Sequence, residues 1–267
     1  MATHAGAELI EEKVAAVERS VEGWKIKTRK DIYRARILIG ADGVNSVLRK
    51  ATVGSFESAD LGLCFGYLTA PINDECVTLK PLPHRRGYMW IFPRGDHMHV
   101  GIAADLNRSS NLRTELDQFL RGQYPKIKPI QKWAALVPRM RTQALRKRVA
   151  GSNWILIGDA AGHVESITGE GILYALTSAQ LAAEAVVEGK PEAYDLYWRQ
   201  VYGQILSYSA ALRSLAYHKY FCVPYFILNV LLAKVPRKRH IAPSALEAGT
   251  AEPEPTFQIE QAEEKYA

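Results

Sequence analysis

Short apolar runs separated by turn residues fill most of the first 160 residues. Residues 8–18 and 24–29 predict two short strands around the turn SVEG, and WKIKT alternates as a half-exposed strand does. The fully apolar run 37–39 and the segment NWILIGDA (153–160) predict strands buried on both faces, as in a parallel sheet. VNSVLRKA (44–51) predicts a short helix directly after the first of these strands.

The pattern of apolar and polar residues is different between about residue 56 and residue 140. Apolar runs such as LGLCFGYLTAPI, GYMWIFP and HMHVGIAADL are joined by short turns, which predicts an antiparallel sheet. Apolar residues at helical spacing predict a helix over 111–125, with Asn111 as its N-cap. A second helix is predicted over 171–189 and ends at Gly189, and the segment from 192 to 234 also has helical, strongly apolar character.

The amino-acid composition excludes few classes of protein. The chain of 267 residues is 48% hydrophobic and 23% charged, which is ordinary for a folded protein. Its net charge of +6 fits a nucleic acid, an anionic membrane surface or a phosphate-bearing ligand. The absence of an aromatic-interleaved basic motif argues against nucleic acid.

The cysteines and the termini indicate a cytoplasmic protein. Cys64, Cys76 and Cys222 lie far apart and form no CxxC pair, so we expect reduced thiols without a disulfide or a metal site. The N-terminus has no apolar signal-peptide core, and no run reaches the ~18 apolar residues of a spanning helix.

Two segments join a buried strand to glycine and aspartate: ILIGADG (37–43) and ILIGDAAG (155–162). Glycine lets a backbone approach a ligand closely, and an aspartate after a parallel strand can accept hydrogen bonds from sugar hydroxyls. TGEGI then opens a helix near Gly171, whose free N–H groups attract negative charge. The alternative interpretation is that both segments are ordinary strand-ending turns.

Three stretches resemble a known superfamily. ARILIGADGVNSVLRK and WILIGDAAGHVESITGEGILYALTSAQLAAEAV resemble the second and third flavin fingerprints of the flavoprotein monooxygenases and geranylgeranyl reductases. GYMWIFPRGDHMHVGIA (87–103) is similar to the YxWxFP stretch of the geranylgeranyl reductases, where it lines the groove for the isoprenoid tail. The reductase branch is indicated mainly by Tyr88, Trp90, Phe92 and Pro93.

The resemblance implies an FAD site in the two glycine–acid turns. Asp159 would bind the ribityl chain beside Gly158, whereas Gly162 and the turn 169–171 would lie along the isoalloxazine ring. The members before residue 50 would support the pyrophosphate region. The full implied set is Asp42, Gly43, Arg49, Gly158, Asp159, Gly162, Gly169, Glu170 and Gly171.

The chain contains no GxGxxG, the motif with which the family holds the ADP half of FAD. We therefore expect an N-terminally truncated homologue, with a separate chain as one source of the missing unit. Both ILIG strands would then lack a neighbour and expose apolar surface.

The expected fold class is α/β with α+β character: a truncated Rossmann-like FAD-binding domain, an antiparallel-sheet substrate domain and C-terminal helices. Residues 1–52 and 146–190 would form the first, 53–145 the second and 191–240 the helices, with 241–267 a disordered tail.

Three functions are compatible with these motifs. The first is FAD-dependent reduction of C=C bonds in an isoprenoid chain, with NAD(P)H or a ferredoxin-type protein as electron donor. The second is an FAD-dependent aromatic or polyene monooxygenase. The third is a non-catalytic remnant that binds a lipid or a partner, which the missing GxGxxG favours.

Several side chains have two interpretations. Tyr88, Trp90 and Phe92 share one strand face, so they form either an aromatic wall for an apolar substrate or ordinary sheet packing. His97 and His99 share a face but are too few for a metal site. His163 could move a proton or be structural, and we assign no catalytic residue.

One basic segment and one apolar segment also have two interpretations each. The group 139–149 is either a solvated face or a site for a nicotinamide phosphate or anionic lipid. Residues 220–240 are either a helix packed on the core or an interfacial helix that contacts a membrane.

Overall fold

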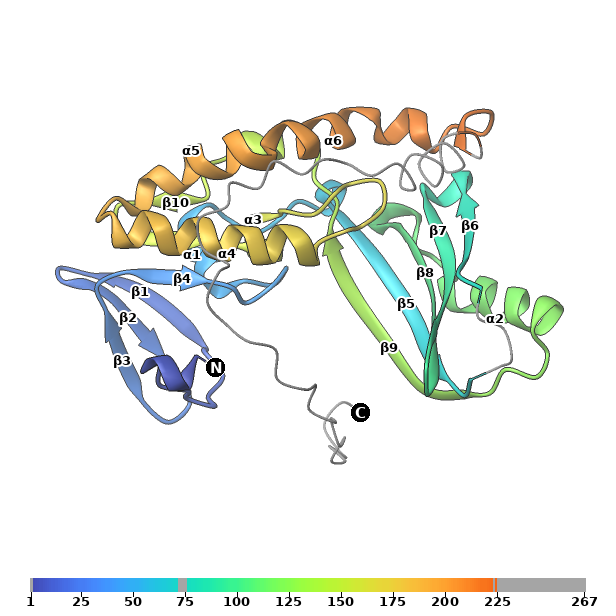
Figure 1. The fold of residues 1–267 in the computed structure, drawn as a ribbon, viewed down its shortest axis with the longest axis horizontal. Coiled ribbons are helices and arrows are strands. Elements are labelled where there is room, and N and C mark those ends of the chain that lie inside the picture. The colour runs from blue at the N-terminus through green and yellow to red at the C-terminus, as the bar shows by residue number, and fades with distance from the viewer. Residues whose placement is uncertain (1, 72–75, 223, 225–267) are drawn as a thin grey trace, which may run out of the picture. The chain divides into compact units, whose positions relative to one another are not determined.

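The computed structural model describes residues 2–71, 76–222 and 224, and they all fall in one compact unit, Met1–Asn229 (Figure 1). Its strands are β1 (Ala16–Ser20), β2 (Gly23–Lys27), β3 (Ile32–Ala35), β4 (Leu38–Gly40), β5 (Leu61–Thr69), β6 (Thr78–Leu82), β7 (Gly87–Arg94), β8 (His97–Asp105), β9 (Pro129–Pro138), β10 (Ala150–Gly151) and β11 (Trp154–Leu156). Its helices are α1 (Val47–Thr52), α2 (Leu112–Gln123), α3 (Gly158–Ala161), α4 (Ile172–Val187), α5 (Tyr194–Trp198) and α6 (Gln204–Ala216), with a π-helical segment, Arg199–Gly203, before α6.

The largest sheet has five antiparallel strands in the order β6-β7-β8-β5-β9. One face packs on α2 and buries a core that includes Ile91, Val100, Ile102 and Leu116 (Figure 1). Because strand residues alternate between faces, Tyr88, Trp90 and Phe92 lie on the other face. The antiparallel sheet and the helix over 111–125 are therefore confirmed.

Asn111 occupies the predicted N-cap position of α2 but does not act as predicted. Its backbone is left-handed, with φ of 58°, and its side chain makes no capping hydrogen bond. Asparagine tolerates this conformation better than most residues, so the residue type fits a turn here rather than a side-chain cap.

The second sheet has the order β10-β11-β4, and β11 runs parallel to β4. The prediction that the first ILIG strand is buried on both faces is wrong: Leu38 is half-buried and Ile39 is 40% exposed. The reason is that β11 is the only described strand beside β4. The prediction that the second ILIG strand lacks neighbours is also wrong, because β10 and β4 flank β11 and bury all three of its residues.

The third sheet is the antiparallel meander β1-β2-β3. Its first strand begins at Ala16 rather than near residue 8, so the predicted strand 8–18 is mostly wrong. Leu9, Ile10 and Val14 are exposed, and the register across the Gly23 turn pairs only residues 16–20 with β2. The turn itself, with Gly23 at φ of +133°, lies where the sequence predicted it.

The helices after residue 170 follow the predicted pattern. α4 is followed by Gly189 in the left-handed conformation (φ +71°), whose N–H bonds back to the carbonyl of Val186. α4 and α5 pack with β11 around Trp154, Ile155 and Trp198. No described helix is both long and apolar enough to cross a membrane.

These observations confirm the expected fold class, a mixed α/β protein with an antiparallel sheet and C-terminal helices. The division into 1–52 with 146–190, 53–145 and 191–240 stays a prediction. The tail 241–267 and residues 225–240 lie outside the described residues. In the described part of the proposed membrane segment, Tyr220 and Phe221 are 70% and 53% exposed, whereas Cys222 is fully buried.

Candidate functional site

The two glycine–acid turns lie at the same edge of the β10-β11-β4 sheet. Parallel pairing aligns Leu156 with Gly40, so both turns follow the carboxyl ends of adjacent strands. Arg49 links them, because its Nη1 donates to the carbonyl of Ala160 at 3.1 Å. The structure thus brings together the two segments that the sequence predicted to act on one ligand.

Asp159 lies at the start of α3 and has an available carboxylate. Its side chain is half-buried, and no hydrogen bond joins it to a described residue. Burial raises the pKa of this carboxyl, and no donor offsets that effect. A β-carbon on Gly171 would lie 3.4 Å from Oδ1 of Asp159. Glycine at this position therefore leaves the space between the Asp159 carboxylate and the start of α4 unfilled.

The turn before α4 is held by its own backbone and by Glu165. The N–H of Glu165 donates to the carbonyl of Glu170, and the N–H of Gly169 donates to the carbonyl of Glu165, both at 2.9 Å. The Glu165 carboxylate accepts from the N–H groups of Ile167 and Thr168. Gly169 has φ of +77° and Glu170 is exposed, so the turn presents backbone rather than bulky side chains at the start of the helix.

The start of α4 has no side-chain cap. Gly171 occupies the N-cap position and offers no side-chain acceptor. The N–H groups of Ile172 and Leu173, the first two of this 16-residue helix, have no partner among the described residues and can meet a negatively charged group.

The first turn and the helix after it contain Asp42, Gly43 and Arg49, whose roles toward a cofactor stay predictions. Asp42 is exposed, and its Oδ2 accepts from the N–H of Val47 at 2.7 Å, so the carboxylate already holds the first turn of α1. Gly43 has φ of +74° with open space where a side chain would be. Arg49 is 2% exposed and stacks on Phe56 at 3.7 Å, and burial lowers its pKa to about 10.

Two of the predicted glycines face protein atoms. A β-carbon on Gly158 would lie 3.1 Å from Cβ of Ala175, and one on Gly162 would lie 2.8 Å from Sδ of Met140. Both have positive φ, at +53° and +82°. Close packing against these neighbours and a positive φ are therefore sufficient reasons for glycine at both positions.

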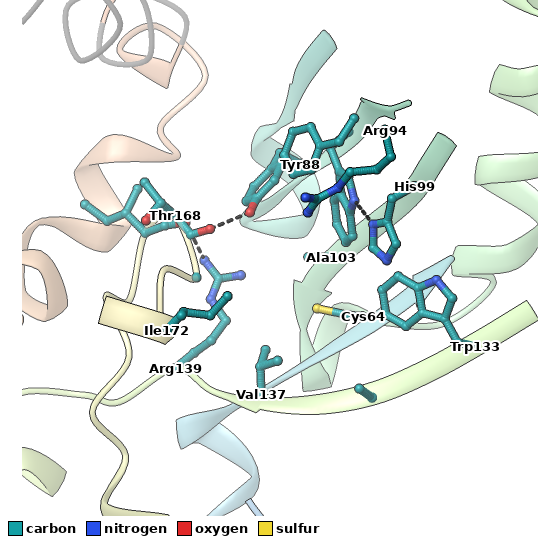
Figure 2. Close-up of a pocket in the computed structure, with 15 residues that line it drawn as sticks. Cys64, Tyr88, Arg94, His99, Ala103, Trp133, Val137, Arg139, Thr168 and Ile172 are labelled. Atoms are coloured by element: carbon teal, nitrogen blue, oxygen red, sulfur yellow. Dashed lines mark hydrogen bonds between the residues drawn. The ribbon is translucent and has the colours of Figure 1, made fainter. Parts of the chain in front are cut away.

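A cavity of about 380 Å³ opens on the free face of the five-stranded sheet (Figure 2). Its walls come from β5, β7, β8 and β9 and from the turn before α4. The lining is mostly apolar, and the volume is that of a small-molecule site. The lining residues are Cys64, Tyr88, Trp90, Phe92, Arg94, His99, Ala103, Trp133, Ala135, Val137, Arg139, Ile167, Thr168, Gly169 and Ile172.

Tyr88 joins the cavity to the glycine turn. Its hydroxyl donates to the carbonyl of Thr168, as the dashed line in Figure 2 shows. The Cys64 thiol also lies in the lining, and burial raises its pKa to about 11; the charge of Arg139 opposes this rise and that of Asp159 adds to it. The predicted cofactor turn and the predicted substrate wall therefore adjoin.

Three flat rings form the floor of the cavity. The rings of Trp90, His99 and Trp133 are mutual neighbours. Their centroids are 6.0 Å apart for Trp90 and His99, 4.9 Å for His99 and Trp133, and 6.1 Å for the two indoles, with interplanar angles of 18°, 20° and 37°. The indole Nε1 of Trp90 donates to Nδ1 of His99 at 3.0 Å. Burial, together with the charges of Arg94 and His97, lowers the pKa of His99, which favours the neutral ring that this hydrogen bond requires.

Glycines beneath the indoles make this floor possible. A β-carbon on Gly101 would lie 2.2 Å from Cζ2 of Trp90, and one on Gly66 would lie 2.5 Å from Cζ2 of Trp133. Each indole therefore lies across a strand position where no side chain rises.

Gly101→Ala is expected to lower the free energy of unfolding by about 1–3 kcal/mol, because the added methyl overlaps the Trp90 ring. The matched control is Gly122→Ala in α2, where a β-carbon meets nothing within 4 Å; it should raise stability by at most about 1 kcal/mol. Urea unfolding of both variants measures the two changes in the free energy of unfolding, which should have opposite signs. Equal effects of the two substitutions would contradict the arrangement of Trp90 over Gly101.

The interpretation of residues 139–149 as a solvated face is wrong for Arg139. Arg139 is 3% exposed, its Nη1 lies 3.5 Å from Asp105 Oδ1, and its guanidinium donates to the carbonyls of Arg86 and Ser166. Arg213 also lies near Asp105, at 3.8 Å.

Other cations of this segment have partners as well. Arg141 pairs with Asp60 and Glu57. Arg146, Lys147 and Arg148 are exposed, as is Gln143, so these positions fit the solvated face.

The histidines separate into different roles. His97 pairs with Asp96 at 2.6 Å at the end of the β7–β8 hairpin, away from the ring floor that holds His99. His163 is fully buried, its Nδ1 contacts the hydroxyl of Tyr202 at 2.8 Å, and burial lowers its pKa to about 3. A neutral, enclosed His163 fits the structural interpretation.

Sequence reasoning missed half of the cavity. Trp133, Ala135 and Val137 alternate along β9 as Tyr88, Trp90 and Phe92 do along β7. The same period-two pattern was available in QKWAALV and could have predicted a shared face. It could not have shown that β9 lies on the same sheet, with β8 and β5 between it and β7.

Comparison with known proteins finds relatives that align with part of the chain. The chain is 29% identical over 204 residues to digeranylgeranylglycerophospholipid reductase of Methanosarcina acetivorans, covering 68% of this chain and 49% of the relative. It is 36% identical over 170 residues to the chloroplastic geranylgeranyl diphosphate reductase of Arabidopsis thaliana, covering 57% of this chain and 33% of the relative. The chain thus spans about half or less of the length of these curated relatives. No family profile matches it.

Solved structures share the fold. A geranylgeranyl bacteriochlorophyll reductase-like protein from Thermoplasma acidophilum superposes with a TM-score of 0.67 at 23% identity, covering 87% of this chain and 64% of that one. A Pseudomonas aeruginosa protein described as a probable FAD-dependent monooxygenase gives a TM-score of 0.56 at 18% identity, covering 82% and 67%. The sequence resemblance to the geranylgeranyl reductases is thereby confirmed over the aligned part of the chain, and the fold is the one these reductase-like and monooxygenase structures share.

Proposed function

We propose that this chain carries the ribityl and ring side of an FAD site together with the substrate pocket of a reductase that acts on C=C bonds of an isoprenoid chain. The observation that supports it most is the contact between Tyr88 and Thr168, which joins an apolar, aromatic-walled cavity to a glycine turn beside the free carboxylate of Asp159. Relatives named for reduction of geranylgeranyl groups favour this substrate class.

The residues present fit part of a flavin. Asp159 would accept from ribityl hydroxyls, and the uncapped start of α4 would face the polar edge of the ring. The buried Nε of Arg49 has no partner among the described residues, which leaves one donor available near the first turn. Asp42, in contrast, is engaged by α1 and would act indirectly, by holding the Gly43 turn. When bound and first reduced by an electron donor, the flavin would supply hydride to one alkene carbon, and the other carbon would take a proton.

The protein's contribution would be enclosure and positioning rather than an acid–base pair. Tyr88, Trp90 and Phe92 would hold an apolar chain against the glycine turn and exclude water. Burial raises the pKa of Tyr88 to about 12, so this hydroxyl, like the Cys64 thiol, keeps its proton at neutral pH. The electron donor, NAD(P)H or a ferredoxin-type protein, stays a prediction, as does a separate chain that supplies a GxGxxG unit.

Absorbance spectroscopy of the purified full chain after mixing with FAD and gel filtration tests the cofactor. We expect a retained flavin band near the visible absorption of free FAD. A chain that stays colourless would contradict the proposal and support the remnant that only binds a lipid or partner.

Anaerobic reaction of the chemically reduced, flavin-loaded chain with geranylgeraniol tests the chemistry. The expected result is flavin reoxidation with addition of one H2 per reduced bond, seen by mass spectrometry. A second candidate, an FAD-dependent monooxygenase, is favoured by the shared fold with a monooxygenase structure. Oxygen-dependent hydroxylation of a phenol or polyene without alkene reduction would select that candidate.

A further inference from the structure

The cavity contains one charged side chain with nothing to pair with among its described neighbours. Arg94 and Arg139 are the charged members of the lining, and no acid is among the lining residues that the structure describes. Arg139 is engaged with Asp105 and two backbone carbonyls. Arg94 is exposed, its guanidinium makes no hydrogen bond or ion pair with a described residue, and the nearby Asp96 is paired with His97.

Arg94 lies at the opposite end of the aromatic wall from the glycine turn. Tyr88, Trp90, Phe92 and Arg94 are alternate residues of β7 and share its cavity face. Arg94 lies six positions after Tyr88, which is about 20 Å of extended backbone. Figure 2 shows the Arg94 side chain extending over this face rather than away from it.

The local charges make an anion the suitable partner. The field of Arg94 contributes to the lowered pKa of His99, so the guanidinium acts on the ring floor. A neutral His99 with Nδ1 accepting from Trp90 keeps its other ring nitrogen protonated, which adds a donor to this region. A guanidinium with no acid beside it binds phosphate oxygens well, and two N–H groups can act at once.

We propose that Arg94 determines specificity by binding the anionic end, a phosphate or diphosphate, of an apolar ligand whose chain lies along Phe92, Trp90 and Tyr88. The inference rests on the proposed function for the identity of the chain as isoprenoid. The diphosphate is already part of a relative's name, so the new content is Arg94 as the residue that selects the anionic group.

Tryptophan fluorescence of the full chain without added flavin tests this proposal, because Trp90 and Trp133 line the cavity. The probes are geranylgeranyl diphosphate, geranylgeraniol, digeranylgeranylglyceryl phosphate and inorganic pyrophosphate. Wild type should bind geranylgeranyl diphosphate or the two-chain phosphate at least about tenfold more tightly than the alcohol. The tighter of the two identifies the source of the phosphate, a free prenyl ester or a lipid headgroup.

Arg94→Gln should abolish that preference while binding of geranylgeraniol stays within about twofold, and Arg94→Lys should retain part of it. The matched control is Arg121→Gln, an exposed arginine on α2 at the other face of the sheet, which removes the same charge and should change nothing.

Three results would overturn the role of Arg94: equal affinity of wild type for the alcohol and both phosphates, a preference that survives Arg94→Gln, or pyrophosphate binding as tightly as the prenyl esters. These outcomes leave the proposed function standing if flavin binding and alkene reduction are observed. Conversely, an Arg94-dependent phosphate preference in a chain that never retains flavin would overturn the proposed function alone.

Discussion

Arg139→Gln is expected to lower the free energy of unfolding by about 3–5 kcal/mol. Arg139 is buried against Asp105, and its removal leaves that carboxylate with less compensating charge in a low-dielectric interior. The carbonyl of Ser166 would also lose its two donors from the guanidinium. Urea unfolding, monitored by tryptophan fluorescence, measures the loss.

Two further substitutions separate the possible reasons for that loss. Arg146→Gln removes an exposed arginine of the same basic segment and should change stability by no more than about 0.5 kcal/mol. Arg139→Lys keeps the charge but cannot reach Asp105, Ser166 and Arg86 at once, so an intermediate loss is expected. A loss below about 1 kcal/mol for Arg139→Gln would refute the buried cluster as a source of stability.

This cluster also connects stability to the site. Arg139 follows β9, and through Ser166 it holds the segment that leads into the turn 169–171. Loss of Arg139 should therefore loosen the junction between the cavity and the cofactor turn.

Asp159→Asn is expected to weaken FAD binding by tenfold or more, because hydrogen bonds to a charged acceptor contribute about 1.5–3 kcal/mol. The same substitution should raise the melting temperature of the flavin-free chain slightly. The reason is that burial raises the pKa of Asp159, so its charged form is unfavourable in the folded protein at neutral pH. A titration of FAD fluorescence and a thermal melt measure the two opposite effects.

The pH dependence gives a second check on Asp159. Because the folded-state pKa lies above the ordinary aspartate value, flavin affinity should fall as the pH drops through that raised pKa, and Asp159→Asn should remove this dependence. Asp31→Asn, in the exposed turn before β3, is the control and should leave affinity and its pH profile unchanged. Unchanged affinity in Asp159→Asn would show that the carboxylate is not a flavin ligand.

Local chemistry made much of the fold predictable from the sequence. Apolar runs between turn residues identified β7 and β8, helical spacing identified α2, and glycine positions marked the end of α4 and the turns after β4 and β11. These signals are local because a strand face or a helix face is defined by residues only a few positions apart. The failures, such as the burial of Ile39, concern neighbours that the pattern cannot specify.

The sequence by itself determined the chemical groups of the candidate site: an aspartate after a strand, a glycine turn opening a helix, and an aromatic strand face. Only the tertiary structure decided their relations. It placed Tyr88 on the carbonyl of Thr168, stacked Trp133 from β9 on His99 from β8, and buried Arg139 from a segment that looks solvated in sequence. The physical reason is that burial and pairing depend on which distant strands become neighbours, whereas period and turn chemistry are set along the chain.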